Sequence, residues 1–343
     1  MLTLEQLLTV PIVGAPLAGG PSTPALTAAV CEGGGLGFVA AGYKTARDVA
    51  ADIAEVRRST KRPFAVNVFF PARLAVDEAA IERYAACLAV DAARYGVSCG
   101  EPRWSDDEWE TKLALVARER PAVVSFAFGC PDAEIVSSLR GEGIAVWCTV
   151  TSPAEAIIAA VAGVDALIVQ GAEAGGHQSS FADTDDAPIG LLPLLQLVRS
   201  VTDLPLIAAG GIATGHGVAA VLAAGASAAQ IGSALMLTPE AGTSDAQRVA
   251  FGEDEPTALT RAFTGRRARG IVNRFLRDHD VAAPRGYPQV HYLTAPLRAA
   301  ARAAGDAGGI NLWAGQAYRL ARAEPAAEHV ERWAAEARAV LRT

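Results

Sequence analysis

The segment from Gln170 to His177 holds the side chains best suited to chemistry in this sequence. It reads Gln-Gly-Ala-Glu-Ala-Gly-Gly-His and leaves an apolar run that predicts a β-strand. The amide of Gln170 can donate and accept hydrogen bonds, which suits the polar edge of a flavin ring. Gly175 and Gly176 let a backbone lie against a flat ring, where a Cβ atom would clash. His177 would stand at the mouth of this site, with a pKa suited to proton transfer near neutrality.

A lone histidine more often has a structural role than a catalytic one. The glycines beside His177 favour the functional interpretation, because functional loops concentrate where strands end. The remaining histidines fit no metal-ligand spacing, and we expect no metal. They are His216, His279, His291 and His329.

Two glycine-rich segments after later apolar runs predict an anion site. Gly210 and Gly211 would let backbone N–H groups approach a phosphate, and a helix beginning near Gly215 would add its positive end. A second set of amides and a hydroxyl is offered by Gln230–Ser233, which contains Ile231 and Gly232. The alternative is a pair of tight turns without a ligand.

Three other segments bear on a ligand site. Asn67 is a polar residue inside an apolar run, so its amide needs either a ligand or a structural hydrogen bond. Ala15–Gly20 ends the first apolar run with small residues that permit close ligand approach. Gly33–Gly37 superficially matches a dinucleotide fingerprint, but it precedes a strand and no acidic residue completes the pattern. We therefore expect a tight turn at Gly33–Gly37 and no Rossmann site.

Short apolar runs alternate with helical stretches along the chain, which predicts a (β/α)8 TIM barrel. Near-continuous apolarity is typical of parallel strands covered on both faces. An open, doubly wound sheet is the alternative. The eight runs are Pro11–Ala15, Leu36–Ala40, Phe64–Phe70, Ala122–Phe128, Ala145–Val150, Ala166–Gln170, Pro205–Ala209 and Ala228–Ala234.

The pattern divides the chain into three parts. Residues 1–238 would form the barrel, 239–288 a small lid after strand eight, and 289–343 C-terminal helices packing back on the barrel. Pro153 after Ser152 marks one helix start inside the barrel, as proline behind a capping residue. The polar segment Asp91–Lys112 would be a turn-rich excursion.

Composition narrows the class of protein. The 343 residues are 51% hydrophobic and 20% charged, which supports a large core. A net charge of −7 argues against nucleic acid or an anionic membrane as the main partner. Five scattered cysteines, no basic leader and no apolar run of spanning length favour a cytoplasmic protein with reduced thiols. A homo-oligomer remains open.

Together these segments resemble the nitronate monooxygenase family, formerly called 2-nitropropane dioxygenases. The resemblance covers nearly the whole chain, and the Glu-Ala-Gly-Gly-His stretch is its most specific part. Later blocks are Phe263–Arg266, Ala268–Gly270 and Trp313–Gln316. Leu17 stands where the family often has methionine. No lysine follows Lys112, so a cationic group near an anionic substrate would be arginine or a backbone amide.

The resemblance implies one non-covalent FMN and a substrate-facing His177. The activity would be oxidation of alkyl nitronates, such as propionate 3-nitronate, by O2 to a carbonyl product and nitrite. Rival functions are an NADH:quinone reductase, an enoyl-thioester reductase and a non-catalytic FMN-binding module. The expected FMN contacts are Ala15, Pro16, Leu17, Asn67, Gln170, Gly175, Gly176, Gly210, Gly211, Gln230, Ile231, Gly232 and Ser233.

Overall fold

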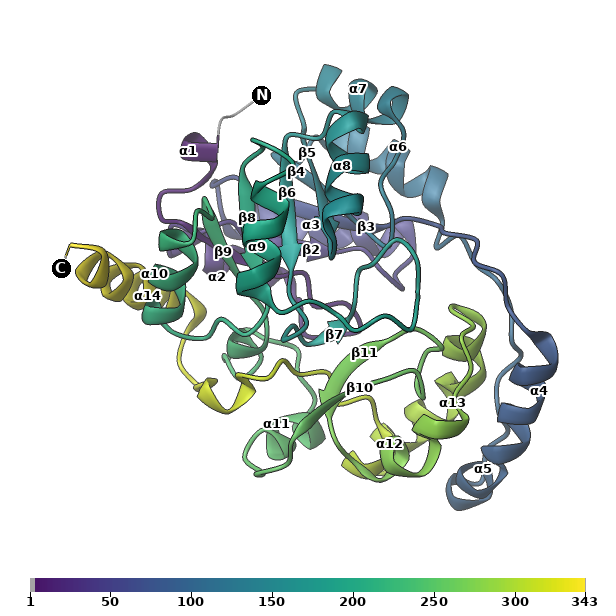
Figure 1. Cartoon of the computed structure of the whole chain (residues 1–343). Helices are drawn as coiled ribbons and strands as arrows, with labels where there is room; N and C mark the ends of the chain where they lie inside the picture. The colour runs from purple at the N-terminus through teal and green to yellow at the C-terminus, as the bar shows by residue number, and fades with distance from the viewer. Residues whose placement is uncertain (1–3, 343) are drawn as a thin grey trace.

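A barrel of eight parallel strands forms the centre of the molecule (Figure 1). The computed structural model describes residues 4–342. Going round the barrel, neighbouring strands follow chain order, and the Gly14 N–H donates to the Leu36 carbonyl to join the first strand to the second. All eight expected strands and the TIM barrel are confirmed. The strands are β1 (Ile12–Gly14), β2 (Phe38–Ala40), β3 (Ala65–Phe69), β4 (Val123–Ala127), β5 (Ala145–Val150), β6 (Ala166–Gln170), β8 (Leu206–Ala209) and β9 (Ala228–Ile231).

Helices surround the barrel between successive strands. The Ser152 hydroxyl accepts from the Glu155 N–H with Pro153 in the first helical position, so the predicted helix start is confirmed. The last helix lies across α10 and α2. The helices around the barrel are α1 (Leu4–Leu7), α2 (Pro24–Glu32), α3 (Ala46–Ser59), α6 (Trp109–Glu119), α7 (Ala133–Gly141), α8 (Pro153–Ala162), α9 (Leu191–Arg199), α10 (Gly215–Ala223) and α14 (Ala326–Leu341).

Alternate residues of each strand serve two apolar layers. In β6, Leu167 and Val169 join the core between strands and helices, whereas Ile168 joins the filling of the barrel. Trp147 and Phe38 pack together in that filling, with ring centroids 6.2 Å apart. The barrel is therefore a packed core, and a ligand site belongs at its carboxyl end.

A second unit covers the carboxyl end of the barrel, below it in Figure 1. Its three-stranded antiparallel sheet consists of β10 (Thr257–Thr260), β11 (Ala268–Ile271) and β7 (Gly176–His177). The short strand β7 comes from the segment after β6, so this sheet ties His177 to the second unit. The helices are α4 (Glu78–Cys87), α5 (Ala89–Tyr95), α11 (Asp245–Ala250), α12 (Arg274–His279) and α13 (Gln289–Ala303), with 3-10 turns η1 (Ser233–Leu235), η2 (Asp280–Ala282), η3 (Ala307–Gly309) and η4 (Tyr318–Leu320).

The second unit differs from the expected lid in what it contains. Helix α13, which was expected to pack on the barrel, instead shares a core with α4, α5 and α12. Residues 96–108 of the expected excursion form neither helix nor strand, which agrees with a turn-rich segment. Asp91, by contrast, is buried in α5 and pairs with Arg274 and His279 at 2.5 and 2.6 Å. A charge buried against a distant partner leaves no local sequence signal. The division at residues 238 and 288 stays a prediction.

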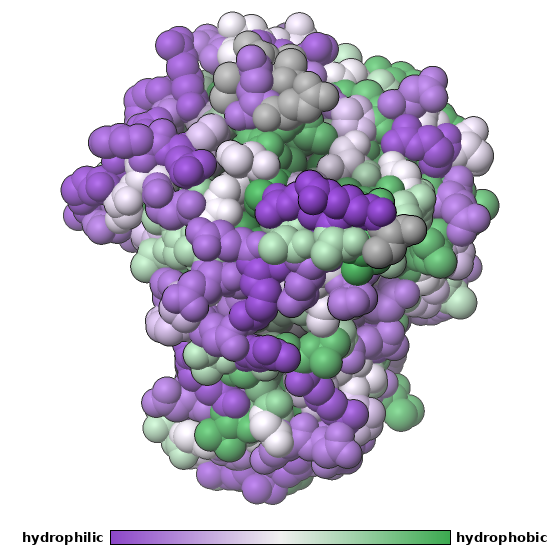
Figure 2. All heavy atoms as spheres, turned by 90° about the vertical axis from the view of Figure 1, so that its left-hand side faces the viewer, coloured by the Kyte–Doolittle hydropathy of each residue, from purple (hydrophilic) through white to green (hydrophobic). Residues whose placement is uncertain are grey.

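The face that carries α10 and α14 is mostly hydrophilic, with scattered apolar side chains (Figure 2). The broad upper body in this view is the barrel, and the narrower lower body is the second unit. Across residues 4–342, no helix combines the length and apolarity needed to cross a bilayer. The five cysteines are free thiols, as expected.

Candidate active site

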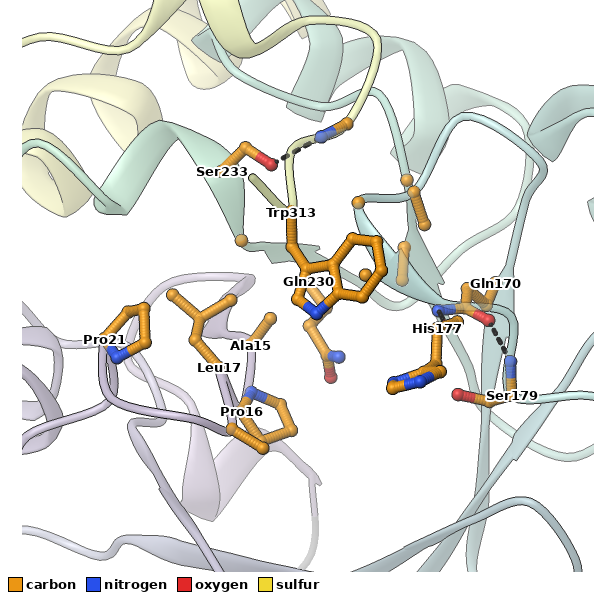
Figure 3. Close-up of a pocket in the computed structure, with 18 of the residues that line it drawn as sticks. Ala15, Pro16, Leu17, Pro21, Gln170, His177, Ser179, Gln230, Ser233 and Trp313 are labelled. Atoms are coloured by element: carbon orange, nitrogen blue, oxygen red, sulfur yellow. Dashed lines mark hydrogen bonds between the residues drawn. The ribbon is translucent and has the colours of Figure 1, made fainter. Parts of the chain in front are cut away.

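A cavity lies between the carboxyl end of the barrel and the second unit (Figure 3). His177 and every expected cofactor residue except Ile231 line it. Ile231 is fully buried in the core between strands and helices, because alternate residues of β9 face opposite sides. Its neighbour Gln230 faces the cavity instead. Ile231 could therefore reach a ligand only through its backbone, which is the kind of contact expected from Gln230–Ser233, and its assignment stays a prediction.

The glycines of the cavity meet two different demands. Gly176, Gly210 and Gly211 have φ of +74°, +112° and +70°, a backbone region that side-chain-bearing residues rarely adopt. Gly175 is needed for another reason: a Cβ there would lie 2.4 Å from the Gly315 nitrogen. The missing side chain of Gly175 thus makes room for the backbone at Gly315. From the sequence, we expected it to make room for a flat ring instead.

The start of α10 is not free to hold an anion. The Gly215 N–H, at the start of the helix whose positive end was expected to favour the anion, donates to Glu336 of α14 over 3.0 Å. The Thr214 hydroxyl accepts from the Gly217 N–H, which caps the same turn. A phosphate in this region would therefore bind the amides near Gly211 and Ser233, and the N-terminus of α10 would not contribute.

Gln170 holds the segment that carries His177 in place. Its Nε2 donates to the His177 carbonyl over 3.0 Å, and its Oε1 accepts from the Ser179 N–H over 2.7 Å (Figure 3). The amide therefore binds the backbone at two points, at His177 in β7 and at Ser179 just beyond it. The amide was expected to contact a flavin, but its observed bonds position His177.

The contact between His177 and Thr264 favours one tautomer of the imidazole. His177 Nε2 lies 2.9 Å from Thr264 Oγ1, and that hydroxyl donates to the Arg266 carbonyl over 3.2 Å. If the Thr264 hydroxyl gives its single proton to the Arg266 carbonyl, it accepts from His177. The proton then sits on Nε2, which leaves Nδ1 as the ring nitrogen with a free lone pair.

Burial and two guanidinium groups keep this imidazole neutral. Desolvation, followed by Arg266 and Arg298, lowers the pKa of His177 to about 3. The expectation of a histidine that titrates near neutrality is therefore wrong. His177 stays an unprotonated acceptor across the physiological range, although its basicity is reduced.

An aromatic wall surrounds His177. Its ring centroid lies 5.6 Å from Phe128, 5.5 Å from Tyr287 and 5.7 Å from Trp313. Tyr43, with φ +67°, stacks on His291 at 4.3 Å and lines the cavity. Sequence patterns gave no sign of this wall, apart from the Trp313 block of the resemblance, because its members come from separate loops.

The cavity is electropositive. No aspartate or glutamate is among the described residues that line it, whereas Arg302 is. The buried Arg298 bonds to Thr294, His291 and Asn311, and these partners are neutral. Buried cations without carboxylate partners favour an anionic ligand nearby. The expectation that arginine would supply the positive charge agrees with this arrangement.

Comparison with known proteins places these features in a family. The family model described as nitronate monooxygenase matches residues 2–336. A nitronate monooxygenase from Pseudomonas aeruginosa is 42% identical over 93% of both chains, and one from Paraburkholderia phytofirmans is 40% identical over 93% of this chain and 90% of its own.

Solved structures agree with this match. The structure of a nitroalkane oxidase from Streptomyces ansochromogenes has a TM-score of 0.96 and 50% identity, covering 98% of this chain and 99% of its own. FabK from Thermotoga maritima has a TM-score of 0.78 at 25% identity, covering 99% and 96%.

The barrel, the glycine loops and the histidine on the cavity wall together define a flavin-dependent oxidoreductase of the TIM-barrel class. Within that class, the chain belongs to the nitronate monooxygenase family.

Proposed function

We propose that this protein binds FMN in the cavity and oxidises alkyl nitronates with O2 to a carbonyl compound and nitrite. The observation that carries this proposal is a neutral imidazole with a free Nδ1 on the wall of an acid-free cavity, in a chain of this family. An electropositive cavity suits an anionic nitronate, and a neutral imidazole suits abstraction of a carbon-bound proton.

The chain's own groups fit a flavin mononucleotide. Gln230 Oε1 is buried and has no hydrogen-bond partner, although Gln230 lines the cavity, so a ligand donor would satisfy it. Gly211, Gly232 and Ser233 all line the cavity, so their backbone amides and the Ser233 hydroxyl are available on that side. We assign phosphate binding to the end of the cavity lined by Gly211, Gly232 and Ser233, and the flavin ring to the end near Asn67.

The remaining chemistry falls to a few side chains. Bound FMN would supply the electron acceptor that is reoxidised by O2. His177 Nδ1 would take a proton from the carbon of a neutral nitroalkane, or orient a nitronate that is already deprotonated. Thr264 and Gln170 hold the imidazole in position, and the aromatic wall excludes water.

No contact in the cavity specifically favours one of the rival functions. A quinone reductase or an enoyl-thioester reductase would need a nicotinamide to reduce the flavin. A passive FMN-binding module would have no use for the orienting bonds around His177.

We expect the purified protein to be yellow and to release FMN, not FAD, on heating. The cavity offers one phosphate end, and the sequence has no adenosine-binding fingerprint. Chromatography of the released flavin against both standards checks this. A colourless protein that fails to take up added FMN would refute the cofactor assignment.

We expect Thr264→Val to reduce activity on a neutral nitroalkane about tenfold or more, because the Nε2 proton loses its acceptor. Thr264→Ser should restore it, and the activity on the nitronate should change less. The nitrogen chemical shifts of labelled His177 report the tautomer directly. Unchanged shifts in a folded Thr264→Val variant would show that Thr264 does not set the tautomer.

A further inference from the structure

The outer faces of α8 and α9 carry an unusual concentration of exposed apolar side chains. We call this surface the α8/α9 face; it comprises Ile157, Ile158 and Val161 from α8 with Leu192, Leu197 and Val201 from α9 and its end. These six account for half of the twelve large hydrophobic side chains exposed in residues 4–342. Val161 alone is 80% exposed.

The two helices lie next to each other on the outside of the barrel (Figure 1). Their exposed side chains therefore lie on the same side of the molecule. None of the exposed residues of α8 or α9 is ionisable. Glu155 of α8 is turned inward, where it accepts from the Phe181 N–H, and Arg199 of α9 is partly buried and donates to the Thr202 carbonyl.

We infer that the α8/α9 face is the interface through which two copies of this chain form a symmetric dimer. A net charge of −7 makes two copies repel one another over most of their surfaces. The α8/α9 face is where they can approach without burying charges of the same sign. A two-fold axis through one face needs a self-complementary surface, and an uncharged apolar one satisfies that need.

The size of the face agrees with this role. From their exposed fractions, the six side chains present on the order of 500 Å², at the upper end of apolar patches on ordinary monomers. The smaller exposed residues among them, Ala154, Pro193 and Gln196, bring the surface toward the roughly 800 Å² that each partner contributes to a standard interface. The core of such an interface is depleted in charge, as here.

The cavity plays no part in this inference. The face lies outside the barrel, and none of its residues lines the cavity. The dimer can therefore be tested whatever the protein oxidises, with variants that leave the flavin site untouched.

Light scattering coupled to size-exclusion chromatography tests the inference on the flavin-loaded full chain. We expect the wild type to have twice the 35.4 kDa mass of one chain at micromolar concentration. Ile158→Glu and Val161→Glu should each weaken the dimer roughly a hundredfold, since each would bury an unpaired carboxylate. Val281→Glu is the matched control: Val281 is fully exposed on η2 of the second unit, and its substitution should leave the dimer intact.

Because the substituted positions are exposed, flavin content and circular dichroism should match the wild type. A monomeric wild type would overturn the inference, including one that instead binds lipid vesicles. A dimer that survives both glutamate substitutions would place the interface elsewhere and overturn it equally.

Discussion

His177→Asn is expected to abolish turnover of a neutral nitroalkane while leaving part of the turnover of the corresponding nitronate. The neutral form must lose a carbon-bound proton, and a histidine base typically contributes about 10²–10⁴-fold to such a step. The nitronate has already lost that proton, so there the imidazole only orients or assists it. The kcat/KM of both forms, for wild type and variant, measures the asymmetry.

His216→Asn is the matched control, because His216 is exposed at the start of α10 and does not line the cavity. FMN content should be normal in both variants. Equal losses on the two substrates would make His177 a binding residue instead of a base. No loss on either would move the chemistry to another part of the cavity.

The pH dependence of the same reaction follows from the lowered pKa of His177. Its value of about 3 means that the base form persists as the pH falls through 6.5, where an ordinary histidine would become protonated. With freshly dissolved neutral nitroalkane, kcat/KM should show no acidic limb centred near 6.5. An acidic limb centred near 6.5 in the wild-type profile would show that His177 titrates normally.

Gly211→Val is expected to weaken FMN binding about a hundredfold. A Cβ at Gly211 would lie 3.1 Å from the Glu173 Cβ, so a branched side chain would displace the loop whose amides are proposed to meet the phosphate. The loss of such charge-assisted bonds costs a few kcal/mol. Equilibrium titration of the apoprotein with FMN, followed by fluorescence, gives the dissociation constant.

Gly225→Val supplies the control for backbone strain. Gly225 has φ +94° and open space around its Cβ position, and it lies at the end of α10, away from the cavity. Both substitutions pay a similar cost of roughly 1–2 kcal/mol for a left-handed backbone. Gly35 would be a poor control, because a Cβ there would lie 2.7 Å from the Ile12 carbonyl oxygen. Similar FMN dissociation constants for Gly211→Val and Gly225→Val would show that the phosphate lies elsewhere.

The barrel could be predicted because short stretches of neighbouring residues determine each of its strands and helices. Each strand is an apolar run, and each helix start carries its own signal, as with Ser152 and Pro153. The glycine loops and His177 were found for the same reason. They directly follow predicted strands, where the carboxyl ends of a barrel gather ligand sites.

What the sequence did not reveal depends on contacts between distant segments. Phe128, Tyr287 and Trp313 meet around His177 only because three loops converge there. The pKa of His177 depends on Arg266 and Arg298, and desolvation has no local pattern. The membership of α13 in the second unit depends likewise on its packing against α5.

The identity of the reductant tests the central claim most directly. Under anaerobic conditions, an alkyl nitronate should bleach the flavin absorbance of the wild type, and admission of air should restore it with release of nitrite. NADH with a quinone should give no turnover. Bleaching by NADH but not by the nitronate would contradict the proposed function and assign the cavity to a nicotinamide-dependent reductase.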